Sequence, residues 1–371
     1  MKTIVVSAVN LTKGGTLTIL RECLEYLSTL TKTGDYRIVA LVYRKDLVFF
    51  HNIEYIEMQW PKKTWVNRLW CEYVTMKKIS IQLSPVYLWL SLHDTTPHVL
   101  AQQRAVYCHN PFPFYKWKTK ECLFAPRIVL LSLFSKWIYR INIRKNRYVI
   151  VQQEWMKKEF IRMFGLQEET IVVSPPVLHP MSVDHFVTDA VSGQAAYSFL
   201  FASFPDSHKN FEMVCQAAEI LKEQWGIENF NVSITIKEDA NTYAKWLYRK
   251  WGKRIPNIKF MGFLDRKTLY EHYDQSHCLV FPSKIETWGL PITEFAAFNK
   301  PMLLADLPYA HETASGCSQV AFFDPNHPQE LASKMKRLIQ GDTSFLKPVE
   351  KRIISPPVAR SWQELFDILL N

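Results

Sequence analysis

Two glutamates eight residues apart, Glu286 and Glu294, are the residues whose types and spacing best suggest chemistry. The run Cys278–Phe281 before them is apolar and has the length of a buried parallel strand. Gly289, which has no Cβ, permits a ligand to approach the backbone closely, and Pro291 suits the first turn of a helix. The sequence therefore predicts a strand, a loop that carries a carboxylate, and a helix whose free N–H groups face that loop.

The start of a helix favours a phosphate, whereas an ionised carboxylate accepts hydrogen bonds from hydroxyl groups. A ligand with hydroxyls at both ends and a diphosphate between them is a sugar nucleotide, and we expect this stretch to bind one. The alternative is that Glu286 is a solvated loop residue and that Glu294 only favours the helix dipole. Glutamates at this spacing are common, so the residues around them decide between the two interpretations.

Those residues resemble the hallmark of the retaining glycosyltransferases of family four, a Glu-x7-Glu motif inside a longer segment. Here the segment reads Pro282-Ser283, then Glu286-Thr287-Trp288-Gly289-Leu290-Pro291, then Glu294. Thr287 and Phe295 stand where the family usually has Gly and Ala, and neither change removes a carboxylate. The resemblance implies the GT-B fold, an α/β architecture of two doubly wound, Rossmann-like domains facing a cleft. It also implies that Glu294 holds the ribose hydroxyls, that Glu286 holds the donor sugar, and that the other donor-binding residues of this segment are Thr287, Trp288, Gly289 and Leu290.

The glycine pair Gly14-Gly15 lies between a predicted first strand, residues 3–9, and a predicted first helix, residues 16–30. In a doubly wound domain this is where backbone amides meet a ligand phosphate, although a glycine pair is also often only a turn. The resemblance implies that Gly14 and Gly15 lie against the distal phosphate of the donor.

Two loops that contain a histidine follow two predicted strands. His93-Asp94 comes after residues 86–92, and His109 comes after residues 104–107. Both imidazoles are therefore expected at the carboxyl edge of the sheet, where such folds bind ligands, although a lone loop histidine is more often structural. The resemblance implies that His109 is the catalytic histidine that contacts the transferred sugar, and we predict that His93 and Asp94 serve the acceptor. A hydrolytic triad is disfavoured because no serine elbow accompanies them.

Lys209-Asn210 follows the predicted strand 197–203 and matches a Lys-Asn or Lys-Gly pair of the family. The resemblance implies that Lys209 neutralises the diphosphate leaving group during catalysis. The family usually has an arginine a few residues earlier, but Phe204 and Asp206 occupy that region here. Either Lys209 works with His208, or a base from the other domain supplies the missing charge.

The length of 371 residues suits two domains. We predict an acceptor-side domain over residues 1–177, joined by a C-terminal helix at 357–371, and a nucleotide-sugar-binding domain over 178–356. The proline-rich residues 174–180 read as the linker. Seven cysteines without a C-x-x-C pair indicate reduced thiols. No signal peptide and no run of roughly 18 apolar residues is evident, which predicts a cytoplasmic protein.

The net charge of +10 and the pI of about 9.1 indicate an anionic partner, either nucleic acid or an acidic membrane surface. Residues 114–147 combine many bases and aromatics with one acid, Glu121, and are the best candidate for a membrane-facing segment. The alternative is a packed helix pair with solvated bases. No recognition-helix, zinc or RNA-binding signature is present, so we expect no nucleic-acid partner.

Together these features predict a retaining glycosyltransferase of the hexosyltransferase type. It would move a sugar from a nucleotide-diphosphate sugar to a saccharide acceptor, expected to be lipid-linked, in bacterial surface polysaccharide assembly of the O-antigen or capsule type. We expect it at the inner face of the cell membrane as a peripheral protein. No cofactor is expected, and no metal, because no two aspartates are spaced as D-x-D. The alternatives are a sugar-nucleotide epimerase of the same fold and a non-catalytic basic nucleic-acid-binding protein.

Overall fold

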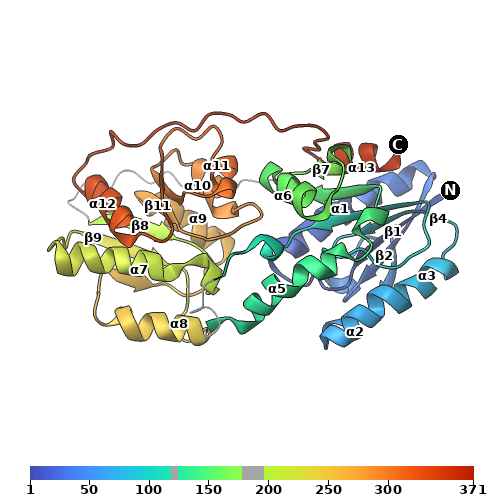
Figure 1. Ribbon diagram of the computed structural model, residues 1–371, viewed down its shortest axis with the longest axis horizontal. Coiled ribbons are helices and arrows are strands. Elements are labelled where there is room, and N and C mark those ends of the chain that lie inside the picture. Colours follow the sequence, from blue (N-terminus) through green and yellow to red (C-terminus); the bar gives the residue numbers. More distant parts are fainter. Residues whose placement is uncertain (118–123, 178–195) are drawn as a thin grey trace. The chain divides into compact units, whose positions relative to one another are not determined.

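The computed structural model describes residues 1–117, 124–177 and 196–371 of the chain (Figure 1). The chain divides into two compact units. The first unit comprises Met1–Phe114, Leu133–Val177 and Ile354–Asn371, and the second comprises Tyr115–Ser132 and Leu178–Ile353. Residues 118–123 of the predicted membrane-facing segment and residues 178–180 of the predicted linker lie outside the described residues.

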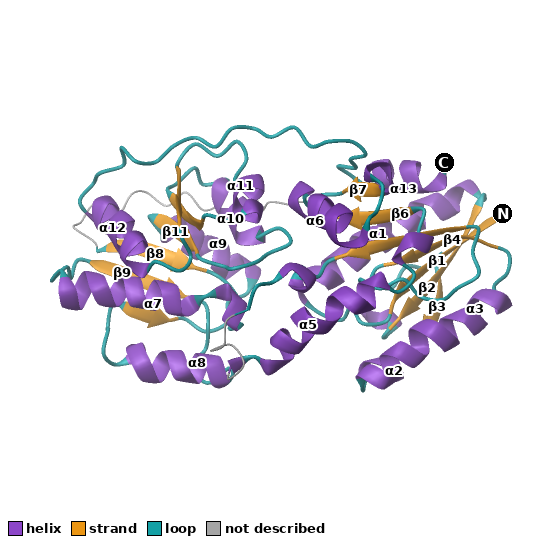
Figure 2. Cartoon of the chain, viewed as in Figure 1, coloured by secondary structure: helices purple, strands orange, loops and turns teal. Residues whose placement is uncertain are grey.

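Parallel strands form the seven-stranded sheet of the first unit, in the order β3-β2-β1-β4-β5-β6-β7 (Figure 2). β1 is buried along all but its first residue and pairs with β2 on one side and β4 on the other. Such continuous apolar runs are typical of parallel strands covered on both faces. The strands are β1 (Lys2–Ala8), β2 (Tyr36–Val42), β3 (Glu54–Glu57), β4 (Val86–Ser91), β5 (Gln103–Cys108), β6 (Tyr148–Val151) and β7 (Ile171–Val173).

The helices of the first unit include both the first and the last of the chain, which pack together. The ring of Phe366 stacks on that of Tyr26 with centroids 5.5 Å apart, and the Tyr87 hydroxyl donates to the carbonyl of Leu370 over 2.7 Å. The C-terminal helix thus completes the core of this unit. The helices are α1 (Gly14–Leu30), α2 (Trp65–Trp70), α3 (Met76–Gln82), α6 (Glu154–Phe164) and α13 (Trp362–Leu370), with α5 (Pro126–Arg140) divided between the units after Ser132.

The second unit has a parallel six-stranded sheet in the order β10-β9-β8-β11-β12-β13. Its strands are β8 (Tyr197–Phe201), β9 (Phe230–Ile234), β10 (Ile258–Phe260), β11 (Cys278–Phe281), β12 (Met302–Ala305) and β13 (Val320–Phe323). Its helices are α7 (Phe211–Glu219), α8 (Thr242–Leu247), α9 (Arg266–Gln275), α10 (Leu290–Ala296), α11 (Pro308–Thr313) and α12 (Pro328–Ile339).

Each sheet has a point where the strand order reverses, between β1 and β4 in the first unit and between β8 and β11 in the second. In open α/β sheets the loops at the carboxyl ends of these two strands form the ligand crevice. The loop after β8 carries Lys209, and the loop after β11 carries Glu286. The loop after β4 carries His93 and Asp94.

The predicted α/β fold with two doubly wound, Rossmann-like domains is confirmed. In detail, α1 begins at Gly14, two residues before the predicted start, so the glycine pair forms the first turn of the helix and not the loop before it. Residues 115–132, predicted within the first domain, group with the second unit, where the ring of Phe124 lies 4.8 Å from that of Trp246. Among the helices of the described residues, none is long and apolar enough to span a bilayer.

Candidate active site

The loop after β11 makes a turn that favours glycine. Gly289 has φ 91° and ψ 59°, in the left-handed region where a side chain is strained. A Cβ at this position would lie 3.3 Å from Ile292 Cδ1 and 3.5 Å from Phe281 Cε1. The glycine is therefore required both by its backbone angles and by the close packing of the loop on the strand before it.

Two hydroxyls from α11 hold the same loop. Tyr309 is buried and donates a hydrogen bond to the carbonyl of Ser283 over 2.7 Å, and Thr313 donates to the carbonyl of Trp288. Because Glu286 lies between these two anchored carbonyls, its backbone position is set by α11. The sequence gives no direct signal for this role of Tyr309 and Thr313.

Lys209 and Glu286 form an ion pair at the reversal point of the second sheet. Lys209 Nζ lies 2.6 Å from Glu286 Oε1, and the two side chains are 16% and 13% exposed. The neighbouring Asn210 has φ 63° and donates its side-chain amide to the carbonyls of Pro282 (3.2 Å) and Pro325 (2.9 Å). The loops after β8, β11 and β13 are thus tied together around a cation and a carboxylate that solvent still reaches.

His208 does not add a positive charge beside Lys209. Its imidazole is buried, and burial, followed by the nearby charges of Lys209 and Lys284, lowers its pKa well below the usual value, so it is neutral at pH 7. Lys284 is a second cation of this region, and its Nζ lies 3.3 Å from Glu212 Oε1. The backbone N–H of Lys284 donates to the carbonyl of His208 over 2.8 Å. Sequence reasoning missed Lys284, although it stands two residues before Glu286.

Glu294 occupies a different environment from Glu286. It is the fifth residue of α10, and its Oε2 accepts a hydrogen bond from the Tyr273 hydroxyl over 3.0 Å. Burial raises the pKa of Glu294, while the Tyr273 hydrogen bond and the charge of Arg266 lower it by less. This hydrogen bond holds Oε2 and thereby orients the whole carboxylate of Glu294. No sequence pattern indicated this role of Tyr273.

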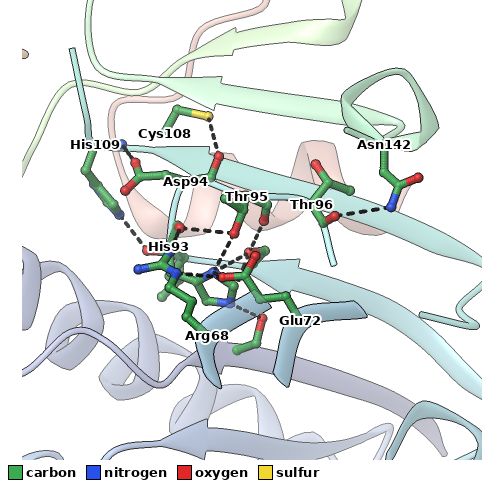
Figure 3. Close-up of polar contacts among 12 residues, drawn as sticks. Arg68, Glu72, His93, Asp94, Thr95, Thr96, Cys108, His109 and Asn142 are labelled. Carbon is green, nitrogen blue, oxygen red and sulfur yellow. Dashed lines mark hydrogen bonds and ion pairs between the residues drawn. The ribbon is translucent and has the colours of Figure 1, made fainter. Parts of the chain in front are cut away.

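In the first unit, Asp94 joins the loops after β4 and β5 (Figure 3). Its φ of 73° is unusual for a residue with a side chain. Its Oδ1 accepts the backbone N–H of His109 over 2.6 Å and that of Asn110 over 3.0 Å. The carboxylate therefore sets the position of His109, and this strained backbone is a feature that accumulates at functional sites.

The imidazole of His109 has a defined tautomer. Its Nε2 lies 3.0 Å from the carbonyl of Leu92, which can only accept, so Nε2 carries the proton. The ring stacks on Tyr107 with centroids 4.5 Å apart, and burial lowers its pKa, so it is neutral. Within the described ranges, Nδ1 has no hydrogen-bond partner, which leaves one acceptor lone pair on this histidine.

His93 belongs to a buried polar network that Figure 3 shows beneath the loop. Its side chain is 1% exposed; Nε2 lies 3.1 Å from Ser7 Oγ and Nδ1 lies 3.1 Å from Thr95 Oγ1. Glu72 Oε1, fully buried, lies 3.4 Å from Nδ1 and accepts from Arg68 Nε over 2.8 Å. Arg68 also donates to the carbonyl of His93 over 2.7 Å. The network holds the loop in place, so the structure gives His93 a supporting position without access to solvent.

The glycine pair and Leu290 are exposed, Thr287 and Trp288 are partly exposed, and Gly289 is buried. Gly14 and Gly15 are exposed at the start of α1, and Gly14 has φ 65° with nothing within 4 Å of a Cβ. The structure thus brings together Lys209 with Glu286, and Asp94 with His109, among the predicted residues. Among the described residues, no three His, Cys, Asp or Glu side chains gather as a metal site would.

We predict that His93 makes the folded protein acid-sensitive. Burial lowers the pKa of His93 from 6.5 to about 4; the charge of Glu72, the next largest contribution, raises this pKa, and the charge of Arg68 lowers it. Between these values the unfolded chain binds a proton that the folded chain does not, so stability falls as pH drops from 6.5 towards 4. The loss attributable to His93 is at most about 3 kcal/mol. Urea unfolding of the parent and of His93→Asn at pH 7 and pH 4.5 measures it; equal losses in both proteins would contradict the assignment.

Comparison with known proteins adds to this geometry. Residues 194–353 match the family described as Glycosyl transferases group 1. The chain is 20% identical over 268 residues to O-antigen chain mannosyltransferase RfbU of Salmonella typhimurium, which covers 71% of this chain and 68% of the relative. It is 18% identical over 236 residues to O-antigen chain mannosyltransferase B of Escherichia coli, with 62% and 61% covered.

Among solved structures, a glycosyltransferase from Rickettsia africae is similar with a TM-score of 0.61 and 17% identity, over 91% of this chain and 88% of the other. At this identity the similarity concerns the fold, which is that of the GT-B glycosyltransferases. The matched domain contains Lys209, Glu286 and Glu294. Residues 194–353 are thus similar to the glycosyltransferase group 1 domain, and the chain is a glycosyltransferase.

Proposed function

We propose that this glycosyltransferase moves a mannosyl group from a nucleotide-diphosphate sugar to a lipid-linked saccharide in the assembly of an O-antigen type polysaccharide. The observation that carries the proposal is the Lys209–Glu286 pair at the reversal point of the sheet in the matched domain. The names of the two relatives support mannose as the sugar and an O-antigen chain as the product.

The two carboxylates have separate tasks in this proposal. Glu294, oriented by Tyr273, accepts hydrogen bonds from the ribose hydroxyls, and Glu286 accepts them from the transferred sugar. Lys209 already contacts Glu286, so one cation can orient this carboxylate and face the diphosphate next to the sugar. With the ribose at Glu294 and the sugar at Glu286, the diphosphate between them would lie beside Lys209, the one lysine of residues 202–210.

Lys209 then acts on the leaving group. Negative charge grows on the diphosphate as the glycosidic bond breaks, and a fixed cation stabilises that charge more than it stabilises the ground state. We propose that this charge replaces a divalent cation. Retention of the anomeric configuration is proposed from the resemblance to family four.

The lipid-linked acceptor is supported by an apolar stripe on α5. Side chains at helical spacing along α5 and the residue after it are exposed, although their types are usually buried: Leu130, Leu133, Phe134, Trp137 and Ile141. Lys136 and Arg140 lie over the Trp137 ring, each 5.6 Å from its centroid, and α5 contains no acid. An exposed apolar stripe flanked by bases fits the surface of an anionic membrane.

A second exposed apolar group lies on α2, in the first unit. Trp65, Val66, Leu69 and Trp70 are 37–74% exposed. Arg68 of this helix donates to the loop that carries His93 and Asp94, and Asn142, just after α5, lies 3.5 Å from the carbonyl of Thr96 in that loop. Both apolar surfaces therefore adjoin the loop proposed to serve the acceptor, which favours an acceptor held at a membrane.

We predict different effects of the two glutamates on nucleotide binding. Glu294→Ala should weaken binding of GDP or UDP, whichever the protein binds, because a charge-assisted hydrogen bond is worth roughly 1.5–3 kcal/mol. Glu286→Ala should leave that affinity nearly unchanged and lower turnover, because its proposed contact is with the sugar. Calorimetry on both variants, with Glu294→Gln as a matched control of shape, checks the division. Equal losses of diphosphate affinity in both alanine variants would refute it.

Lys209→Ala should lower kcat by at least about a hundredfold, the scale of one lost electrostatic contact to the transition state, with a smaller change in donor KM. Lys237→Ala is a matched control, because Lys237 also pairs with a carboxylate in this unit but is exposed (Nζ to Asp239 Oδ1, 3.2 Å). Transfer by the parent should persist in excess chelator. Restoration of a lost activity by magnesium or manganese would instead show that a metal carries the charge.

The membrane proposal predicts sedimentation with anionic liposomes, little with neutral ones, and release by high salt. Lys136→Glu with Arg140→Glu should reduce binding by about tenfold or more, because each base near an anionic surface contributes roughly 1 kcal/mol. Phe134→Ser with Trp137→Ser should reduce it further in low salt. Trp225→Ser is the control, because Trp225 is also exposed and lies under a lysine, Lys336, 5.4 Å from its centroid. Sedimentation that these stripe variants do not change would favour an acceptor in solution.

A further inference from the structure

A cavity of about 590 Å³ opens in the second unit beside the loops that carry Lys209 and Glu286. It lies against α7 and α8, which are neighbours in the lower part of this unit (Figure 1). None of the residues assigned to the donor lines it. Its volume is within the range of small-molecule sites, about 300–1,000 Å³.

Aromatic rings form one wall of the cavity. Phe124 and Trp246 lie with centroids 4.8 Å apart and an interplanar angle of 41°, and Trp117, 37% exposed, lines the opening. Lys250 Nζ lies over Trp246, 5.6 Å from the ring centroid. Flat apolar rings at the edge of a polar cavity suit a ligand that has both C–H faces and polar groups.

Groups that donate and accept hydrogen bonds form the rest of the lining. Glu212 is one of the lining residues, with Oε1 3.3 Å from Lys284 Nζ and Oε2 in contact with the Tyr243 hydroxyl. Gln216, one turn along α7, adds an amide. Lys284 pairs with this carboxylate and Lys250 lies over Trp246, so both cations of the described lining already have partners. The carboxylate can accept hydrogen bonds from hydroxyls.

We propose that this cavity is a second saccharide site, which binds a neutral segment of the glycan chain. The proposal rests on the function given above, because the enzyme's own acceptor and product are glycans. Ser207, Asn210 and Lys284 line the cavity and belong to the same loops as Lys209 and Glu286. A glycan bound here contacts the loops that position the donor residues, and it would keep a growing chain on the enzyme between transfers.

The test is binding of mannobiose to the full chain in the absence of donor. Saturation-transfer NMR and tryptophan fluorescence measure this binding. We expect saturable binding that Trp246→Ala weakens by at least about tenfold, the loss of one central aromatic contact. Trp225→Ala, which removes another lysine-capped tryptophan of this unit, should not change it. Because Trp246 also packs on Trp251, Gln216→Leu serves as a second variant that removes a polar contact without opening the core, and it should weaken binding as well.

Three outcomes would overturn the site: no saturable mannobiose binding, binding that survives both Trp246→Ala and Gln216→Leu in folded proteins, or displacement of the sugar by inorganic phosphate. Lys209→Ala separates this proposal from the proposed function. If that variant loses transfer but keeps mannobiose affinity, the two sites are distinct. If the parent binds mannobiose through Trp246 but transfers no mannose, the saccharide site stands and the proposed reaction fails.

Discussion

The ion pair between Lys209 and Glu286 exists because two strands that are far apart in sequence pair directly. β8 and β11 are neighbours in the second sheet, so residues 77 positions apart meet at its edge. Asn210 supplies the side-chain donors that the irregular loops after β11 and β13 need, since their carbonyls have no ladder partner. A half-buried ion pair gains little net stability, because desolvation offsets the attraction. The ion pair instead fixes the positions of a cation and a hydrogen-bond acceptor at the edge where sheets of this kind bind ligands.

In the first unit a carboxylate, and not an amide, joins two loops at the edge of the sheet. Asp94 accepts two backbone N–H groups and thereby fixes the loop that carries His109. Below it, Arg68, Glu72 and His93 form a buried network in which removal of one member would leave a charge or a polar atom unpaired. Such networks are costly to bury but specify one loop conformation. In both units, therefore, polar side chains position the partly buried groups that can do chemistry.

Aromatic residues are distributed according to two different physical needs. Most close the cores, as Tyr26 and Phe366 do between the first and last helices. The stripe on α5 is exposed, Phe124 and Trp246 are partly exposed, and both groups lie beside bases. Exposed apolar area of this kind is unfavourable in water unless a ligand or a membrane covers it. These surfaces agree with a polymer substrate carried on a lipid.

The sequence alone determined the fold class, and it indicated Lys209 and Glu286, which the structure brings together. Short apolar runs that end in loops containing Pro, Gly and His predict parallel strands, because a strand covered on both faces has few polar positions. Only the tertiary structure decided that His208 is neutral, that His93 is enclosed, that Tyr273 orients Glu294, and that α5 turns an apolar stripe outward. Each of these properties depends on burial or on partners from distant segments. Charge, tautomer and exposure follow from the residues that surround a side chain in space, which its own sequence neighbourhood does not specify.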